Sequence, residues 1–276
     1  MSESTACSLI TGASSGIGAA LARGLAAEGR PLVLVARRLE RLTDLATCLL
    51  AAHGIRVEVI ALDLATPEAV QQLLAELAAR QLVVHTLVNN AGFGLRGGFQ
   101  QATWPEVQRM LQLMVEVPTQ LMQAVLPGMQ AAQQGRILNV ASLAGLIPGL
   151  PGSCLYSASK AYLIRLSQSL AAENRSLGIR VMVLCPGYVH TEFHAVLGVE
   201  ERMRRLPALF WMESAQVADR ALKALDGSRV VVVPGLINKV MAALAMSLPE
   251  PLAVGLSSRF SRRYRTRASQ GLSRSD

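Results

Sequence analysis

The chain has 276 residues, of which 51% are hydrophobic and 17% are charged, so the bulk is not disordered and can form one sizeable α/β core. The formal net charge is +8, but residues 259–276 hold six arginines and one acid, so five of the eight excess charges lie in this terminal tail. The rest of the chain is almost balanced in charge, and we therefore expect no nucleic-acid partner.

The N-terminal segment, residues 1–8, is short and polar, and it lacks a basic region followed by an apolar one. No secretory signal is predicted, and the expected location is cytoplasmic. The cysteines are scattered, without a CxxC pair or a Cys/His spacing that suits zinc. They are interpreted as buried thiols, and no metal site is expected.

Short apolar runs alternate with longer helical segments along the chain. Most runs are continuous in Val, Ile and Leu, which is typical of parallel strands buried on both faces. The predicted strands are Ser8–Thr11, Leu32–Ala36, Arg56–Ala61, Val83–Val88, Arg136–Val140, Arg180–Leu184 and Arg229–Val233. The predicted helices include Ile17–Glu28, Leu39–Ala52, Pro67–Ala79, Leu113–Gln134 and Tyr156–Leu177. Such β–α repeats predict a Rossmann-like, doubly wound parallel sheet of about seven strands, with helices on both faces.

No internal repeat or low-complexity linker divides the chain, so residues 1–258 are predicted to form one domain. Residues 236–256 are apolar and helix-like, but their unbroken part, residues 240–248, is far shorter than the roughly 20 residues that span a bilayer. We interpret this segment as a helix that covers the sheet or a subunit interface. A helix on a membrane surface is the alternative, followed by a mobile basic tail at residues 259–276.

A glycine-rich turn follows the first predicted strand, with the sequence TGASSGIG at residues 11–18. Gly12 permits a tight turn, Gly16 lets the backbone approach phosphate, and Gly18 permits close packing of the helix on the sheet. The amino terminus of the next helix offers free N–H groups and a positive dipole end to a pyrophosphate. The spacing G-x-x-x-G-x-G differs from the usual G-x-G-x-x-G fingerprint.

The end of the second predicted strand indicates which dinucleotide is bound. Sites specific for NAD place an acidic residue there, whereas this strand ends in Ala36 and is followed by Arg37 and Arg38. Arginine suits a 2′-phosphate because its planar fork donates paired, charge-assisted hydrogen bonds. Arg41 is a weaker candidate. The cofactor expected from these residues is NADP(H).

Tyr156 and Lys160 form a Tyr-x-x-x-Lys pair, which places both side chains on one face of a helix. A free tyrosine has a pKa of about 10, and an ammonium group beside it stabilises the phenolate. Ser142 follows the predicted strand Arg136–Val140, where its hydroxyl could polarise a substrate carbonyl. These three residues are the candidate catalytic group.

Five motifs in order make the chain resemble the classical short-chain dehydrogenase/reductase family over residues 6–235. They are TGASSGIG at 11–18, LVNNAG at 87–92, the serine after Arg136–Val140, YSASK at 156–160 and CPG at 185–187. The resemblance implies that Tyr156 is the acid–base residue, that Lys160 binds the nicotinamide ribose and that Ser142 orients the substrate. It also implies a homodimer or homotetramer.

The resemblance further assigns Asp63 and Leu64 to the adenine, residues 90–92 to the adenosine side and residues 186–191 to the nicotinamide end. The predicted cofactor-binding residues are then Gly12, Ser14, Ser15, Gly16, Ile17, Gly18, Arg37, Arg38, Asp63, Leu64, Asn90, Ala91, Gly92, Tyr156, Lys160, Pro186, Gly187, Val189 and Thr191.

One position departs from the family pattern. The family commonly has an asparagine before its fifth strand, where it maintains a water-linked proton relay from the lysine. Counting back from LPGM at residues 126–129 places Met114 there. A thioether does not donate a hydrogen bond, so we expect slower proton transfer, with Ser142, Tyr156 and Lys160 still present.

The residues between 191 and 215 form the expected substrate lid, and they are largely apolar. The first hypothesis is therefore an NADP(H)-dependent oxidoreductase acting on a hydrophobic ketone, aldehyde or alcohol. The second is a catalytically weak NADPH-binding sensor or scaffold, which Met114 and the basic tail would suit. Nucleic-acid binding through that tail is the third.

Overall fold

The computed structural model describes residues 5–95, 99–193 and 206–264, with side chains described as far as Arg259. A seven-stranded sheet in the order β3-β2-β1-β4-β5-β6-β9 lies at its centre, and all neighbouring strands pair in parallel. The strands are β1 (Thr5–Thr11), β2 (Leu32–Ala36), β3 (Val57–Ala61), β4 (Leu82–Asn89), β5 (Gly135–Val140), β6 (Ile179–Leu184) and β9 (Val231–Val232). The predicted doubly wound sheet is confirmed.

The burial of each strand follows its place in the sheet. Every residue of β2 and β5 is buried, because both strands have neighbours on either side and helices on both faces. The edge strands β3 and β9 are mostly half-buried. The predicted strand Arg229–Val233 is reduced to the two residues of β9, which pair with Val183 and Leu184 of β6.

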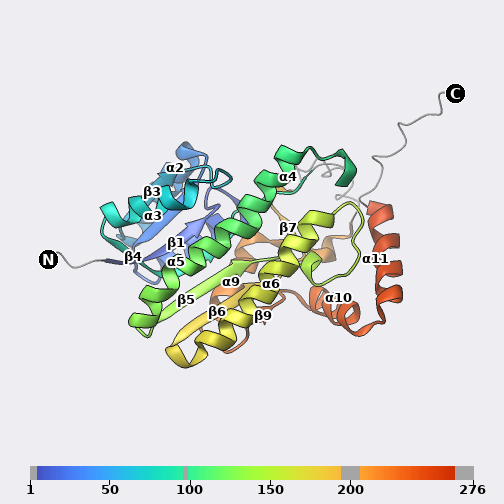
Figure 1. Ribbon diagram of the computed structural model, residues 1–276. Helices are drawn as coiled ribbons and strands as arrows, with labels where there is room; N and C mark the ends of the chain where they lie inside the picture. The colour runs from blue at the N-terminus through green and yellow to red at the C-terminus, as the bar shows by residue number, and fades with distance from the viewer. Residues whose placement is uncertain (1–4, 96–98, 194–205, 265–276) are drawn as a thin grey trace.

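Helices cover both faces of the sheet (Figure 1). One face packs against α1 (Gly16–Ala26), α2 (Leu39–His53) and α9 (Ser214–Leu225) through a common buried cluster. The other face packs against α3 (Ala69–Ala79), α5 (Val117–Ala131) and α6 (Cys154–Asn174). Both clusters consist mainly of Leu, Val, Ile and Ala, which fixes each helix by burial of its apolar stripe.

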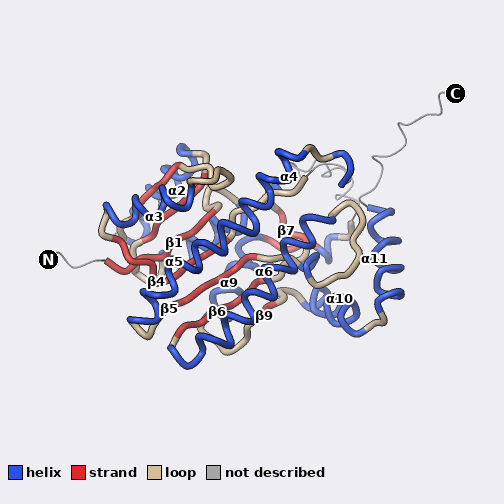
Figure 2. The backbone as a smooth tube through the Cα atoms, in the orientation of Figure 1, coloured by secondary structure: helices blue, strands red, loops and turns tan. Residues whose placement is uncertain are grey.

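The strand order reverses direction between β1 and β4, which places a crevice at the carboxyl ends of these two strands. Figure 2 shows loops at the strand ends that face α4 (Trp104–Leu111) and β7 (Tyr188–His190). Two of the turns there are the 3-10 segments η1 (Phe99–Gln101) and η3 (Leu143–Gly145). This edge of the sheet is therefore where a ligand is expected.

The long helix predicted to begin at Leu113 starts earlier, as α4, and passes through a π-helical turn, η2 (Gln112–Glu116), into α5. The N–H of Val117 bonds to the carbonyl of Gln112, five residues back. Pro118 has no N–H, so it cannot complete an ordinary helical bond to the carbonyl of Met114. The proline explains why the helix changes its winding at this point.

The C-terminal region consists of α10 (Leu236–Ser247) and α11 (Glu250–Tyr264), separated at Pro249. The helix α11 continues to Tyr264, past residue 259 where the basic tail is predicted to begin, and residues 265–276 lie outside the described residues. A short parallel ladder joins β7 to β8 (Trp211–Glu213), with η5 (Ala208–Phe210) just before it. Twelve residues of the predicted lid at 191–215, namely residues 194–205, lie outside the described residues. None of the helices described is both long and apolar enough to cross a bilayer.

Candidate active site

The glycine turn between β1 and α1 adopts a conformation that requires its glycines. Gly12 has φ of +67° and Gly16 has φ of +56°, a region that L side chains rarely occupy. A Cβ on Gly12 would lie 2.9 Å from the Cα of Ala91, and one on Gly16 would lie 2.9 Å from Cγ2 of Thr191. The turn is thus packed between the segments that follow β4 and β7.

The side chain of Asn90 holds this turn in place. Its Nδ2 donates to the carbonyls of Thr11 and Gly12 at 3.0 and 3.1 Å, and its backbone N–H donates to Oγ1 of Thr11. A Cβ on Gly18 would lie 2.4 Å from this Nδ2, so Gly18 permits the packing behind the turn and does not line the cavity. Asn90 was predicted to line the adenosine side, and it both lines the cavity and fixes the turn.

The start of α1 fits a pyrophosphate. Its first turn has no acidic residue, and its N-cap Ser15 makes no side-chain capping bond, so the helix N–H groups are available to an anion. The residues present therefore fit a dinucleotide at this turn.

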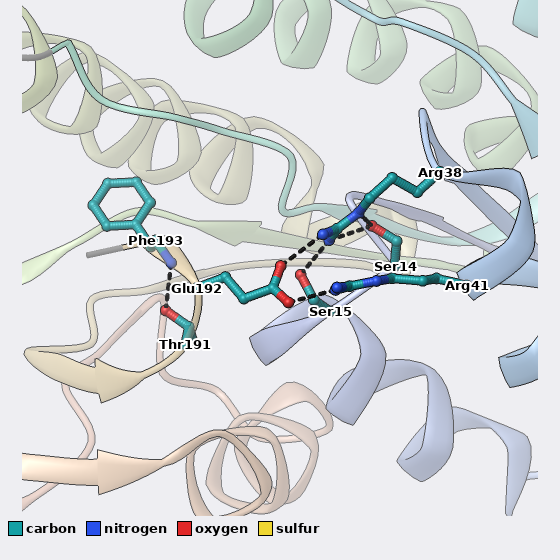
Figure 3. A network of polar contacts seen from close by, with 7 residues as sticks. All are labelled: Ser14, Ser15, Arg38, Arg41, Thr191, Glu192 and Phe193. Carbon is teal, nitrogen blue, oxygen red and sulfur yellow. Dashed lines mark hydrogen bonds and ion pairs between the residues drawn. The ribbon is translucent and has the colours of Figure 1, made fainter. Parts of the chain in front are cut away.

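Arg38, two residues after β2, carries a positive charge beside the glycine turn, where the adenosine end of the cofactor is predicted (Figure 3). Its guanidinium donates to the hydroxyls of Ser14 at 3.0 Å and Ser15 at 2.9 Å, which fixes the fork beside the glycine turn. It also forms an ion pair of 2.7 Å with Glu192, and Arg41 forms a second ion pair with the same carboxylate. Arg41 does not line the cavity, and Figure 3 shows it reaching the Glu192 carboxylate from the same side as Arg38.

Asp63 and Leu64 follow β3, the neighbour of β2 in the sheet, and both line the cavity. The carboxylate of Asp63 accepts from Arg109 at 2.8 Å and from the N–H of Ala65 at 3.0 Å. Burial alone would raise the pKa of Asp63, but these bonds outweigh it and lower that pKa. Asp63 is thus a fixed negative charge, and α4 supplies its partner.

The three candidate catalytic residues line the same cavity. Ser142 lies two residues beyond β5, where its Oγ accepts from the N–H of Ala144 at 3.1 Å. Tyr156 and Lys160 lie one turn apart on α6, with Nζ of Lys160 5.7 Å from the centre of the Tyr156 ring. The ring of Phe193 lies 5.4 Å from that of Tyr156.

Lys160 is buried, and its Nζ donates to the carbonyl of Val140 at 2.8 Å. Burial lowers the pKa of Lys160 to about 8, because desolvation disfavours the ammonium form. The end of β5 thus holds the lysine in position, while burial makes its ammonium group easier to deprotonate.

Met114, in the π-helical turn, lies next to this lysine. A Cβ on Gly92 would be 3.7 Å from Cε of Met114 and 3.8 Å from Nζ of Lys160, so both side chains border the same small residue. Met114 is buried, and Oγ of Ser159 is 4.0 Å from its sulfur. A thioether therefore stands beside Lys160, where the family pattern suggests an amide.

The cavity that joins these groups has a volume of about 670 Å³. It runs from the glycine turn past Tyr156 to the C-terminal helices. Those helices contribute Met241, Leu244, Ala245, Leu248, Ala253, Leu256 and Ser257. The interpretation of residues 236–256 as a cover for the sheet or a subunit interface is incomplete, because their inner face forms the apolar wall of this cavity.

Glu192, Arg109 and Asn238 are polar residues at or beside the cavity that are not among the predicted site residues. Glu192 and Arg109 line it, and both were missed because their partners lie 154 and 46 residues away. Asn238 of α10 is buried against Gly187, where a Cβ would meet its Oδ1 at 2.3 Å. Its only sequence signal is a polar residue within an apolar helix. Among the described residues, no group of three or more His, Cys, Asp or Glu could hold a metal ion.

Comparison with known proteins gives consistent matches. The model of the short chain dehydrogenase family matches residues 6–201. An uncharacterized oxidoreductase of Myxococcus xanthus is 34% identical over 245 residues, which cover 88% of this chain and 93% of that protein.

Two solved structures extend the similarity to nearly the whole chain. A short-chain dehydrogenase from Sphingobium yanoikuyae in complex with NADPH has a TM-score of 0.76 at 33% identity and covers 98% of this chain and 100% of its own. The bulky-bulky ketone specific alcohol dehydrogenase from Comamonas testosteroni has a TM-score of 0.73 at 29% identity, covering 97% of both chains. Together with the site geometry, these matches establish that the chain belongs to the short-chain dehydrogenase family and is an oxidoreductase that uses a nicotinamide cofactor.

Proposed function

We propose that the protein is an NADP(H)-dependent carbonyl reductase, or an alcohol dehydrogenase in the reverse direction, for a hydrophobic substrate. The observation that carries the proposal is one cavity that joins the glycine turn, Ser142, Tyr156 and Lys160 to an apolar wall. NADP(H) is favoured over NAD(H) because Arg38 is held by the hydroxyls of Ser14 and Ser15 at the adenosine end.

Each candidate catalytic residue has a proposed role. The Oγ of Ser142 accepts from the N–H of Ala144, so its own proton is available to a substrate carbonyl oxygen. Tyr156 donates a proton to the same oxygen as it becomes an alkoxide, and the Lys160 ammonium stabilises the phenolate that remains. The nicotinamide, when bound, supplies or accepts the hydride.

The adenosine and nicotinamide ends would be held by different parts of the chain. Arg38, with Ser14 and Ser15, would take the 2′-phosphate, and Lys160 would take the nicotinamide ribose. The turn at Pro186 and Gly187 would border the nicotinamide, since both residues line the cavity close to α10. Cytoplasmic location and formation of a homodimer or homotetramer stay predictions.

The apolar wall suggests the substrate class. Leu244 and Leu256 line the cavity, although more than half of each side chain is exposed, so both have apolar surface that a substrate could cover. A solved relative is described as specific for bulky-bulky ketones, which is consistent with a substrate that has two large apolar groups. We therefore expect an aryl or long-chain ketone to be a better substrate than acetone.

A catalytically weak NADPH-binding protein is the second candidate, and Met114 beside Lys160 favours it. The experiment is a panel of ketones and aldehydes, with NADPH oxidation followed for wild type and Met114→Asn. We expect measurable turnover of apolar ketones by wild type and a severalfold higher kcat for Met114→Asn, because an amide can order a proton-relay water. A wild type that binds NADPH but reduces no carbonyl compound would support the second candidate.

A further inference from the structure

Glu192 is paired with the guanidinium of Arg38, which is the group that the 2′-phosphate would need. Its carboxylate pairs with Arg38 at 2.7 Å and with Arg41, from a position directly after Thr191 (Figure 3). Arg38 is also bonded to Ser14 and Ser15, so its fork is held at the glycine turn while its Nη1 holds the carboxylate. A carboxylate and a phosphate can each accept paired hydrogen bonds from the planar fork of an arginine, so they compete for the same donors.

The charge around the start of α2 explains why the carboxylate lies there. Arg38 is the N-cap of α2 and Arg41 is in its first turn, so two cations face the positive end of the helix dipole. Glu192 neutralises part of this charge from another segment of the chain. Hydrogen bonds from Arg41 and Arg38 lower its pKa, so the carboxylate is ionised at neutral pH.

We propose that Glu192 is an internal competitor of the cofactor's 2′-phosphate, and that it sets the affinity for NADPH relative to NADH by occupying Arg38. The proposal rests on the proposed NADP(H) preference. The 2′-phosphate gains Arg38 only when Glu192 gives it up, whereas a 2′-hydroxyl carries no charge that draws Arg38 from the carboxylate. Glu192 thus reduces affinity for NADPH more than for NADH.

The competition also links the two ends of the site. Glu192 lies between Thr191, whose Cγ2 packs at Gly16, and Phe193, whose ring lies against Tyr156. The N–H of Phe193 donates to Oγ1 of Thr191 at 3.3 Å, which keeps these three residues in one short turn. Release of Glu192 by a phosphate therefore acts on the segment that borders the catalytic tyrosine.

The test is the equilibrium dissociation constant of NADPH, NADH, 2′,5′-ADP and 5′-AMP, measured by calorimetry for wild type and Glu192→Gln. Because exposed ion pairs are modest in strength, we expect Glu192→Gln to bind NADPH and 2′,5′-ADP about threefold to tenfold more tightly. Binding of NADH and 5′-AMP should change less than about twofold. Glu40→Gln is the matched control, since Glu40 is an exposed acid in the first turn of α2, and it should change none of the four constants.

The same substitution in an Arg38→Ala background tests whether the effect of Glu192 depends on Arg38. In Arg38→Ala protein, the further change Glu192→Gln should no longer strengthen NADPH binding selectively. The proposal is overturned if Glu192→Gln leaves the NADPH constant unchanged, or if it strengthens NADPH and NADH equally. If wild type binds NADH as tightly as NADPH but Glu192→Gln prefers NADPH, competition is supported and only the preference assigned to wild type fails.

Discussion

The two ends of the cavity are built in different ways. At the nucleotide end, buried strands and backbone hydrogen bonds fix the glycine turn, and Asn90 ties it to β1. At the substrate end, α10 and α11 present leucines whose side chains stay more than half exposed. A backbone-built site tolerates few changes, whereas a wall of side chains can be altered without moving the cofactor. Substitutions at the nucleotide end should therefore affect cofactor binding, and those at the substrate end should affect substrate binding alone.

The largest expected effect is at the catalytic centre, where the two ends meet. Tyr156→Phe removes the proton donor, so kcat should fall about a thousandfold, while the dissociation constant of NADPH changes less than about twofold. Steady-state kinetics and calorimetry measure the two quantities. Tyr162→Phe is the control: it lies on the same helix, its hydroxyl is 2.9 Å from Oγ1 of Thr119, and its loss should leave kcat unchanged. A Tyr156→Phe variant with a tenth of wild-type activity would refute the assigned role.

Substitution of Lys160 tests how much folding stability is lost by burying its ammonium group. Burial lowers its pKa from 10.5 to about 8, so the unfolded chain binds more protons between these values and stability rises with pH there. Lys160→Met should lack this rise and be more stable than wild type at pH 7, by at most about 3 kcal/mol for a shift of this size. It should also be inactive.

Denaturant unfolding at pH 7, 8 and 9.5 measures the Lys160 effect. Lys223→Met is the control, because Lys223 is exposed and pairs with Asp219 on the surface of α9. That variant should keep the wild-type pH dependence. If Lys160→Met proves less stable than wild type at pH 7, the bond to Val140 outweighs the burial of the charge.

Arg38 tests the adenosine end. Arg38→Ala removes charge-assisted hydrogen bonds, so the dissociation constant of NADPH should rise about 10-fold to 100-fold, with little change for NADH. Fluorescence titration with both cofactors measures the difference. Arg56→Ala, which removes an arginine paired with Glu58 on β3, should leave both constants unchanged. An equal loss for NADPH and NADH would mean that Arg38 supports the turn and does not recognise the phosphate.

The smallest expected effect is at the side-chain wall. Leu244→Ala removes apolar surface from the cavity, so the KM of a bulky ketone should rise about fivefold while NADPH binding is unchanged. Kinetics with one bulky and one small ketone separate the two effects. Leu236→Ala, on the same helix but outside the cavity, is the control. A loss of NADPH affinity in Leu244→Ala would show that the two ends are not independent.

The sequence alone was sufficient for the elements whose signal is local. Continuous apolar runs predicted the seven strands of the main sheet, and Leu32–Ala36 matches β2 residue for residue. The glycines at 12 and 16 were predictable because a positive φ excludes most other residues. The Tyr156 and Lys160 pair was predictable because helical spacing puts the two on one face.

Tertiary structure decided the contacts between distant segments. Glu192 meets Arg38 across 154 residues of chain, and no periodic pattern marks such a pair. The sequence of α10 and α11 did not reveal that they line a cavity, because burial against the sheet and burial around a cavity require the same residue types. Neighbouring residues thus determined the strands, the turn and the helix that carries Tyr156 and Lys160. The packing of those parts determined which charge faces Arg38 and which apolar surface faces the substrate.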